Sequence, residues 1–355
     1  MTDANFPEFL FNQTPWSEKG SVFWPASAFT LRRNISRHHF PHKQTEAGAR
    51  QVLDEITSSI MKLPLEDPMY IDFSVLDPAK REFIFEHYFI PDGIYEERPH
   101  QGIITDKTGS FLAGINLTDH LTLQMIDCKG SWHKTWEILR NYERELCKKL
   151  DFSFSNRFGY LTSNYYSCGT GLSLRLYLHL PALLQLDDPE NPFYLSQEED
   201  FVITQMGDDK EEGIFQGDLV VLQNKRSLGI SEDHMLHTLF RGASKLINRE
   251  NECRTQIKNG NFPEMKDMIA RSFGILMHSY QMPTSEALGA LSLIKLGIDL
   301  NWVEGVSDLE INQIFFKCRR GHLLIEDSGD HTQEEILHKR AEFIHSSLKD
   351  ARLII

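Results

Sequence analysis

The sequence predicts an α+β domain followed by an all-helical domain. Segments typical of strands alternate with segments typical of helices as far as about residue 258. From Glu264 onward, helical stretches alternate with short turns and no segment has a strand pattern. Between the two parts, Asn259 to Pro263 interrupts the helical periodicity with Gly260 and Pro263. We therefore expect a loose tail over residues 1–22, an α+β domain over 23–258 and a helical domain over 259–355.

Helices in the first domain are predicted by apolar residues that recur at helical spacing. The clearest is an amphipathic segment from Ser131 to Leu150, whose apolar stripe favours core packing over a cofactor-binding role. The apolar run from Leu172 to Leu186 is also interpreted as a helix, with His179 as a buried core histidine inside it. Further helices are expected over Thr45–Lys62, Asp77–His87 and Asp233–Glu252.

Short apolar runs bounded by polar turns predict the strands. Exposed loops are expected where acidic residues and prolines cluster, over Asp187–Asp200, and in the acid-rich stretch Gly207–Gly213. The strands are expected over Gln101–Asp106, Phe111–Asn116, Leu121–Asp127, Phe201–Met206 and Leu219–Leu222.

Composition narrows the range of functions. The formal net charge of −14 repels phosphate backbones, so a nucleic-acid partner is not expected. The five cysteines form no CxxC pair and are odd in number, which argues against a disulfide framework or a zinc site and for a reducing cytoplasm. No apolar run is long enough for a membrane span, and Met1 to Pro7 lacks the pattern of a signal peptide.

Taken alone, the residues give few catalytic signals. Cys168 to Gly171 is a glycine turn that could approach a phosphate, but no lysine follows it, so a plain tight turn is favoured. Asp119 and His120 could pair as a base and its orienting acid, although neighbouring residues on a strand point to opposite faces. The histidines His38, His39 and His42 lack acidic or cysteine partners at ligand spacing, so a solvated loop is favoured over a metal site.

Four ordered motifs add a family resemblance. Gly159 to Ala182, with its segments GYLTS, GTGL and HLPA, resembles the phosphagen-kinase signature GYLTSCPTNxGTGLRAS…HLPA. Asn116–Gln124 (NLTDHLTLQ) resembles NEEDHLRIQ, and Ser27–Asn34 (SAFTLRRN) resembles SRIRLARN. Asn224–Glu232 (NKRSLGISE) resembles the loop NQRTLGxSE. The stretches RSFGIL and KLGIDL, which begin at Arg271 and Lys295, resemble the helical domain of the McsB-type protein-arginine kinases.

The resemblance implies a phosphagen-kinase domain, an antiparallel sheet flanked by helices, followed by the helical McsB-type domain. It also implies transfer of the ATP γ-phosphoryl group to a guanidinium nitrogen. In that chemistry arginines clamp the phosphates, magnesium bridges them and a carboxylate takes the guanidinium proton.

Most positions that would carry this chemistry are substituted. The family's base falls on Thr118, and the acid before it falls on Leu117. The signature cysteine falls on Asn164. What remains is His87, which matches a family histidine near the nucleotide, and Glu232, which matches an acid of the guanidinium-side loop. The degenerate ATP pocket is therefore expected at Ser27, Ala28, Thr30, His87, Thr122, Ser173, Thr204 and Ser227, with arginine positions at all of these except Ser27 and His87.

A single arginine that contacts the transition state contributes about 10³–10⁵ in rate to related phosphoryl transfers. Loss of the base and of about six cationic positions favours a pseudokinase, with neither ATP nor magnesium bound. The alternative is an active protein-arginine kinase with a rearranged pocket that recruits neighbouring cations. Arg175, two residues after Ser173, would face away from the pocket if this segment were a helix. The neighbouring cations are Arg32, Arg33, Arg157, Arg175, Lys225 and Arg226.

The family's phosphoarginine-binding motif RDxxRA falls on Ile336 to Ala341. Only Arg340 and Ala341 match it, so an ordinary amphipathic helix is favoured here over a binding site. By resemblance, the partners would be a small McsA-like activator, a ClpC-type unfoldase and a second copy of the chain. We therefore expect a cytoplasmic McsB-like pseudokinase that serves as an adaptor in protein quality control.

Overall fold

The computed structural model describes residue 10 and residues 21–23, 25–90, 98–186, 200–205, 216–325 and 331–355. The expected N-terminal tail and the loops 187–200 and 207–213 lie almost wholly outside these residues. Among the described helices, none combines the length and the apolar character needed to cross a membrane.

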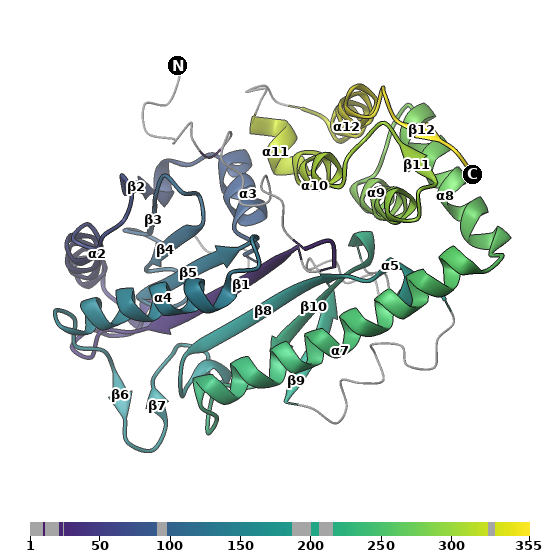
Figure 1. Ribbon diagram of the computed structural model, residues 1–355. Coiled ribbons are helices and arrows are strands. Elements are labelled where there is room, and N and C mark those ends of the chain that lie inside the picture. The colour runs from purple at the N-terminus through teal and green to yellow at the C-terminus, as the bar shows by residue number, and fades with distance from the viewer. Residues whose placement is uncertain are drawn as a thin grey trace.

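The core is an eight-stranded antiparallel sheet with the order β2-β3-β4-β5-β1-β8-β10-β9 (Figure 1). The described strands of this sheet are β1 (Ala26–Arg33), β2 (Met69–Asp72), β3 (Gly102–Thr105), β4 (Phe111–Ile115), β5 (Leu121–Asp127), β8 (Leu172–His179), β9 (Phe201–Gln205) and β10 (Leu219–Asn224). Two short strands, β6 (Phe154–Ser155) and β7 (Gly159–Tyr160), form a separate hairpin.

Helices α2, α3 and α7 begin within one residue of their predicted starts, and α7 runs on to Asn259, past its predicted end at Glu252. Thr45, Asp77 and Ser231 each accept a hydrogen bond from a backbone N–H three residues later and so cap a helix. The described helices here are α2 (Glu46–Ile60), α3 (Pro78–His87), α4 (Trp132–Cys147), α5 (Pro181–Gln185) and α7 (Glu232–Asn259), with 3-10 turns η2 (Pro41–Lys43), η3 (Phe73–Val75), η4 (Tyr165–Ser167) and η5 (Gln216–Asp218).

One face of the sheet packs against α4 and α7, which run in front of it in Figure 1. Phe29 stacks on Trp136 of α4 with ring centroids 6.0 Å apart. A Cβ on Gly242 of α7 would approach Phe201 to 2.8 Å and Leu222 to 3.5 Å, so the glycine permits this close helix–sheet contact. We call this side, which carries Phe29, Leu174 and Leu222, the helix face.

The predicted helix over 172–186 is wrong for its first half. Residues Leu172–His179 form β8, a central strand that pairs with β1 and β10, and only Pro181–Gln185 is helical. The even-numbered leucines face one side, while Ser173, Arg175 and Tyr177 face the other, which is the two-residue alternation of a strand. His179 therefore ends a strand and does not lie within a helix.

The C-terminal part is mainly helical, as predicted, and lies above the sheet in Figure 1. It also holds a small two-stranded sheet of β11 (Val303–Glu304) and β12 (Arg352–Leu353), which the strand-free prediction missed because each strand has only two residues. Its described helices are α8 (Pro263–His278), α9 (Thr284–Asp299), α10 (Asp308–Lys317), α11 (Arg320–Ile325) and α12 (Gln333–Ser347).

Two buried polar contacts join this part to the sheet domain. Glu86 of α3 accepts hydrogen bonds from the backbone N–H groups of Gly321 (3.0 Å) and His322 (3.2 Å), and its side chain also pairs with His322 Nδ1 at 2.8 Å. The hydroxyl of Ser292 on α9 donates to Asp218 at 2.5 Å and lies 2.8 Å from His179 Nε2. The two parts therefore share a polar as well as an apolar interface.

Asp218 gives this interface a pH dependence. Burial raises the pKa of its carboxyl to about 6, against the hydrogen bonds from Ser292 and Gln185. Because the folded pKa lies above the ordinary 3.8, the contribution to stability is present in full below pH 4 and is lost as the pH rises through 6. Relative to wild type, Asp218→Asn should therefore gain up to about 3 kcal/mol in unfolding free energy between pH 4 and 7.

Urea unfolding at a series of pH values measures this difference, with Asp54→Asn on the exposed side of α2 as the matched control. If the difference between Asp218→Asn and wild type stays constant over the range, Asp218 does not titrate there.

Candidate functional site

The strand registers place most of the predicted pocket positions on one face of the sheet. Cross-strand partners in an antiparallel sheet share a face, and Thr30 pairs with both Ser173 and Gln124. The same face carries Ala28, opposite Arg175 in β8, and Thr204, opposite Val221 in β10. We call it the pocket face. Ser27 lies one residue away from Ala28 and therefore on the helix face, so its predicted place in the pocket is wrong.

A cavity opens on the pocket face beside the turn between β4 and β5. Three of the predicted positions line it, Thr30, Thr118 and Thr122. Ala28, Ser173 and Thr204 share the face but do not line the cavity. The remaining lining residues are Arg32, Ile90, Leu112, Gly114, Leu117, Gln124 and Arg175.

Two arginines, Arg32 and Arg175, line this cavity. Arg175 could not do so if residues 172–186 formed a helix. On β8, Ser173 and Arg175 are two residues apart and so point to the same side. Arg32 lies opposite Thr122 on the neighbouring strand. The pocket thus has a cation two residues after Thr30 and another two residues after Ser173, both of which are positions where the family has an arginine. Its described lining holds no carboxylate.

Main chain from the end of α3 crosses the pocket face and binds its polar groups. The side-chain amide of Gln124 donates to the carbonyl of Tyr88, and its oxygen accepts from Thr30 at 3.1 Å. The guanidinium of Arg175, which is buried, donates to the carbonyl of Phe89 at 3.1 Å. Phe89 itself has a positive φ of 51°, a conformation that non-glycine residues adopt only when packing imposes it. Gln124 and Arg175, two of the polar groups on this face, therefore already have partners within the chain.

Asp119 is a structural residue. Its carboxylate accepts from the side chain of Asn34 at 2.6 Å and from the backbone N–H of Ser163 at 2.7 Å, and Arg32 Nε lies 4.0 Å away. It therefore ties together the ends of β1, the β4–β5 turn and the segment after β7.

His120 does not pair with Asp119. Its Nδ1 accepts from the backbone N–H of Ile35 at 3.0 Å, so its Nε2 donates to the carbonyl of His39 at 2.9 Å. Burial lowers the pKa of His120 to about 4, and the ring stays neutral. The structure thus separates the two residues of the suggested base–acid pair, because each has its own buried partners.

Residues Cys168 to Gly171 form a tight turn, the structure that the sequence favours for them. Gly169 has a φ of 109° and Gly171 a φ of 66°, and a Cβ on Gly169 would come within 2.3 Å of the carbonyl oxygen of Ser227. Ser227 is buried and donates to the carbonyls of Tyr166 (3.2 Å) and Cys168 (3.1 Å). At this position, where the family has an arginine, Ser227 therefore links its own loop to the segment 166–168.

His87 lies outside the cavity, at the contact between α3 and α11. It is fully buried, 3.4 Å from the carbonyl of Gly109, and its ring packs near those of Phe83 and His322. Burial lowers the pKa of His87 to about 3, so the ring carries no charge at neutral pH.

Glu232 lies in the first turn of α7, on the helix side of the sheet, and burial raises the pKa of its carboxyl. Among the charges that act on it, those of Glu143 and Arg33 have the largest effect, and these two residues form a largely buried ion pair with an N–O distance of 2.5 Å. Glu232 is therefore separated from Thr118 by the sheet, and the structure does not bring the two together.

Arg340 is buried on α12, where its Nε donates to the carbonyl of Cys318 and its Nη1 to that of Met282, both at 2.7 Å. Ile336 is buried on the same helix. These contacts fit the amphipathic-helix reading. Among the described residues, no group of three or more histidine, cysteine, aspartate or glutamate side chains is arranged to hold a metal ion.

Sequence reasoning missed the residues that fill the pocket. Gln124 belongs to the quoted motif NLTDHLTLQ, and its alternation with Leu121 and Leu123 could have placed it on the same face as Thr122. The main chain at Tyr88 and Phe89 carries no sequence signal for its role, because the role belongs to backbone carbonyls.

Comparison with known proteins identifies the family. Residues 51–253 match the model of the ATP:guanido phosphotransferase C-terminal catalytic domain, and residues 263–353 match that of the protein-arginine kinase McsB C-terminal domain. A protein-arginine kinase from Chlamydia pneumoniae is 35% identical over 348 residues, covering 94% of each chain. One from Brevibacillus brevis is 27% identical over 352 residues, covering 95% of this chain and 98% of the relative.

Solved structures share the fold at lower identity. The substrate-free duplicated taurocyamine kinase from Schistosoma mansoni has a TM-score of 0.58 at 18% identity, covering 76% of this chain and 39% of its own. Lombricine kinase has a TM-score of 0.56 at 18% identity, covering 70% of this chain and 72% of its own. The chain therefore belongs to the McsB-type protein-arginine kinases of the ATP:guanido phosphotransferase family.

Proposed function

We propose that this chain is a pseudokinase, an McsB-like protein whose pocket no longer supports phosphoryl transfer and whose fold serves binding. The observation that carries the proposal is the state of the pocket face. Threonine stands at the base position Thr118, and the buried cation Arg175 and the amide of Gln124 are engaged by the carbonyls of Phe89 and Tyr88. A guanidinium nucleophile needs a carboxylate to take its proton, and the described lining supplies none.

The test is an assay of the purified full chain with magnesium, ATP and an arginine-containing protein substrate, with and without an McsA-like activator. We expect no phosphoarginine by mass spectrometry and no thermal stabilisation by millimolar ATP, because ligand binding to the folded state would raise the melting temperature. A protein-arginine kinase relative assayed in parallel is the positive control. Phosphoarginine that depends on this chain would overturn the proposal.

An active kinase with a rearranged pocket is the second candidate, and one observation favours it. Arg32 and Arg175 both line the cavity, and a pair of guanidinium groups can hold phosphate oxygens. On this reading Arg175→Met would abolish phosphoarginine formation, while Arg157→Met would leave it unchanged, since Arg157 lies on the β6–β7 hairpin outside the cavity. Equal activity of both variants would remove the argument for the rearranged site.

We further propose that the chain acts in the cytoplasm as a homodimeric adaptor for a ClpC-type unfoldase, with an McsA-like protein as its activator. The support is the match of residues 263–353 to the McsB C-terminal domain, together with the resemblance of the sequence motifs. Size-exclusion chromatography with light scattering gives the oligomeric state. The same measurement with a ClpC-type unfoldase, with and without ATP-site substitutions, tests whether complex formation is independent of the pocket.

A further inference from the structure

Exposed aromatic side chains gather around the β6–β7 hairpin, which lies at the lower edge of Figure 1, away from the helical C-terminal part. Tyr165 is 69% exposed, Tyr166 is 65% exposed and Phe154 is 59% exposed. Single exposed apolar residues are common on protein surfaces, but a group of them marks a site where another molecule binds. We call this group the aromatic surface, and its members are Phe154, Phe158, Tyr165, Tyr166 and Leu228.

Hydrogen bonds hold the segments of the aromatic surface side by side. The pairing of β6 with β7 joins the first two of them. Tyr160 of β7 exchanges two backbone hydrogen bonds with Gly169, at 2.8 Å and 3.1 Å, and this closes the loop that carries the two exposed tyrosines. The hydroxyl of Ser227 donates to the carbonyl of Tyr166 at 3.2 Å, so the loop that carries Leu228 lies beside the same tyrosines. One extended segment of another protein can therefore contact all of these segments.

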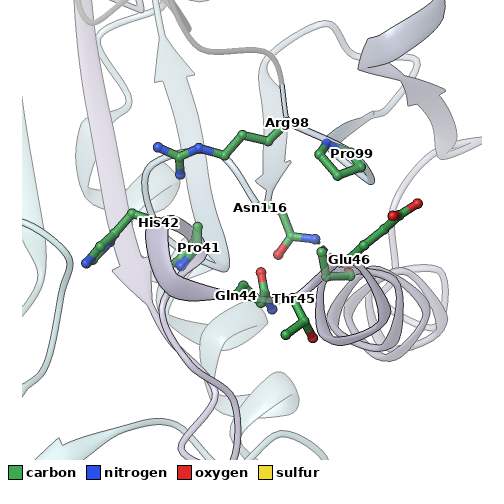
Figure 2. A pocket seen from close by; sticks show the side chains of 9 residues that line it. Pro41, His42, Gln44, Thr45, Glu46, Arg98, Pro99 and Asn116 are labelled. Atoms are coloured by element: carbon green, nitrogen blue, oxygen red, sulfur yellow. Dashed lines mark hydrogen bonds between the residues drawn. The ribbon is translucent and has the colours of Figure 1, made fainter.

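The aromatic surface is anchored to the sheet domain. Asp119 accepts from the backbone N–H of Ser163 at 2.7 Å, two residues before Tyr165. The β4–β5 turn that carries Asp119 begins at Asn116, whose Nδ2 donates to the carbonyl of Ala49 at 2.8 Å, and Figure 2 shows this amide beside the first turn of α2. A surface whose backbone is already ordered loses less conformational entropy when a partner binds.

The aromatic surface is positively charged, although the chain as a whole has a formal net charge of −14. The two stretches that carry it, residues 152–170 and 224–231, contain no aspartate or glutamate. The guanidinium of Arg157 lies over the ring of Phe158, 5.0 Å from its centroid, so cation and aromatic ring are adjacent. The cations of the two stretches are Arg157, Lys225 and Arg226.

Neighbouring carboxylates offset this charge only in part. Asp200 pairs with Arg226 at 3.2 Å. Asp151 directly precedes the first stretch, and it accepts from the hydroxyl of Ser36 at 2.5 Å. Glu232 directly follows the second stretch and is half-buried. An acidic partner therefore complements the aromatic surface better than a basic one does.

We propose that the aromatic surface binds an extended segment of a partner protein in which acidic residues are interspersed with leucine or aromatic residues. The apolar side chains of this segment pack against Phe154, Tyr165 and Tyr166, and its carboxylates face Arg157 and Lys225. A basic segment would meet like charge, and an acidic segment without apolar residues would leave the aromatic rings in water. The proposal adds a recognition site to the adaptor role and does not depend on the catalytic state of the pocket beside the β4–β5 turn.

The test uses the full chain and a short fluorescein-labelled peptide in which glutamate alternates with leucine and phenylalanine, and which contains no arginine. Fluorescence anisotropy should show saturable binding that weakens as sodium chloride is added, because salt screens exposed charges. A peptide with lysine in place of each glutamate should bind at least about tenfold more weakly, and so should a peptide with alanine in place of each leucine and phenylalanine.

Tyr165→Ser/Tyr166→Ser should weaken binding of the glutamate peptide by at least about tenfold, because exposed aromatic anchors supply much of the affinity at such sites. The matched control is Tyr280→Ser, which removes a tyrosine that is 74% exposed on the C-terminal part, and it should leave binding unchanged. Circular dichroism checks that both variants are folded.

Lys225→Glu tests the charge. It should weaken binding of the glutamate peptide at least about threefold and strengthen binding of the lysine peptide, because the sign of one exposed charge is reversed. The matched control Lys62→Glu reverses an exposed lysine just after α2 and should change neither affinity.

The proposal is wrong if the glutamate peptide does not bind to the wild type, or if the lysine or alanine peptide binds as well as it does. Unchanged binding to Tyr165→Ser/Tyr166→Ser would place the peptide elsewhere and would also overturn it. If the peptide does not bind, and light scattering shows a wild-type dimer that this double variant dissociates, the aromatic surface is an interface between two copies of the chain. Because the peptide contains no arginine, none of these results bears on the phosphoarginine assay of the pseudokinase proposal.

Discussion

Arg33→Met is expected to lower the free energy of unfolding by about 3–5 kcal/mol, because it leaves a largely buried carboxylate without its partner. The Arg33 side chain has no exposed surface and forms the 2.5 Å ion pair with Glu143 of α4. It also donates to the carbonyls of Arg32 (2.7 Å) and Thr170 (2.9 Å), and its guanidinium lies 3.6 Å from the ring centroid of Tyr160. One side chain therefore joins β1, α4 and the glycine turn.

Urea unfolding at pH 7 measures the loss. The matched control is Arg37→Met, which removes an ion pair of the same N–O distance to Glu55 from an arginine that is 63% exposed. An exposed pair contributes no more than about 1 kcal/mol. Arg33→Met/Glu143→Leu should recover part of the loss, because it removes the stranded charge as well. If Arg33→Met and Arg37→Met cost the same, burial does not govern the strength of the pair.

Arg340→Met should destabilise the C-terminal domain by about 2–6 kcal/mol, since two buried carbonyls lose their donor and each costs about 1–3 kcal/mol. These carbonyls belong to Cys318, which ends α10, and to Met282, which precedes α9, so Arg340 holds three helices together. Arg271→Met is the matched control, because Arg271 is 76% exposed on α8 and its ion pair with Asp267 lies at the surface. Chemical unfolding followed by circular dichroism measures both variants.

The same variant separates a structural arginine from one that recognises phosphoarginine. A structural role predicts that free phosphoarginine does not raise the melting temperature of the wild type. Stabilisation by phosphoarginine that is lost in Arg340→Met, with little change in unfolding free energy, would assign the residue to ligand binding instead.

How much of the fold the sequence predicts depends on whether a segment is patterned locally. The caps at Thr45, Asp77 and Ser231 and the amphipathic stripe of α4 are local signals, and these helices lie where they are expected. For β8 the sequence carries the alternating pattern of a strand, but the length of the apolar run predicts a helix. The residues LSLRLYLH alternate strictly, yet the following apolar residues of α5 extend the run to a length typical of a helix.

The wrong prediction for residues 172–186 also gave a wrong orientation for Arg175 in the predicted pocket. With residues 172–186 as a helix, Arg175 points away from Ser173; on β8 the two share one face of the sheet, and Arg175 lines the cavity there. The pattern of β1, the other central strand, does not predict a strand, because β1 is buried on both faces and reads ASAFTLRR with no regular alternation of apolar and polar residues. The positions of His87, Tyr88 and Phe89 could not be inferred, because they depend on packing between segments that are far apart in the sequence. For the contact between α3 and α11 this separation exceeds two hundred residues.

The contact between Glu86 and the start of α11 has a consequence for the order in which the chain can fold as it is synthesised. The two backbone N–H groups that Glu86 binds belong to residues 321 and 322, which leave the ribosome 235 and 236 positions after Glu86 itself. Until then the α3 surface around Phe83 and His87 lacks its covering partner, and the sheet domain alone exposes apolar side chains and an unpaired carboxylate. At translation rates of about 5–20 residues per second this interval lasts on the order of ten seconds or more, during which the nascent sheet domain would present a surface for chaperones to bind.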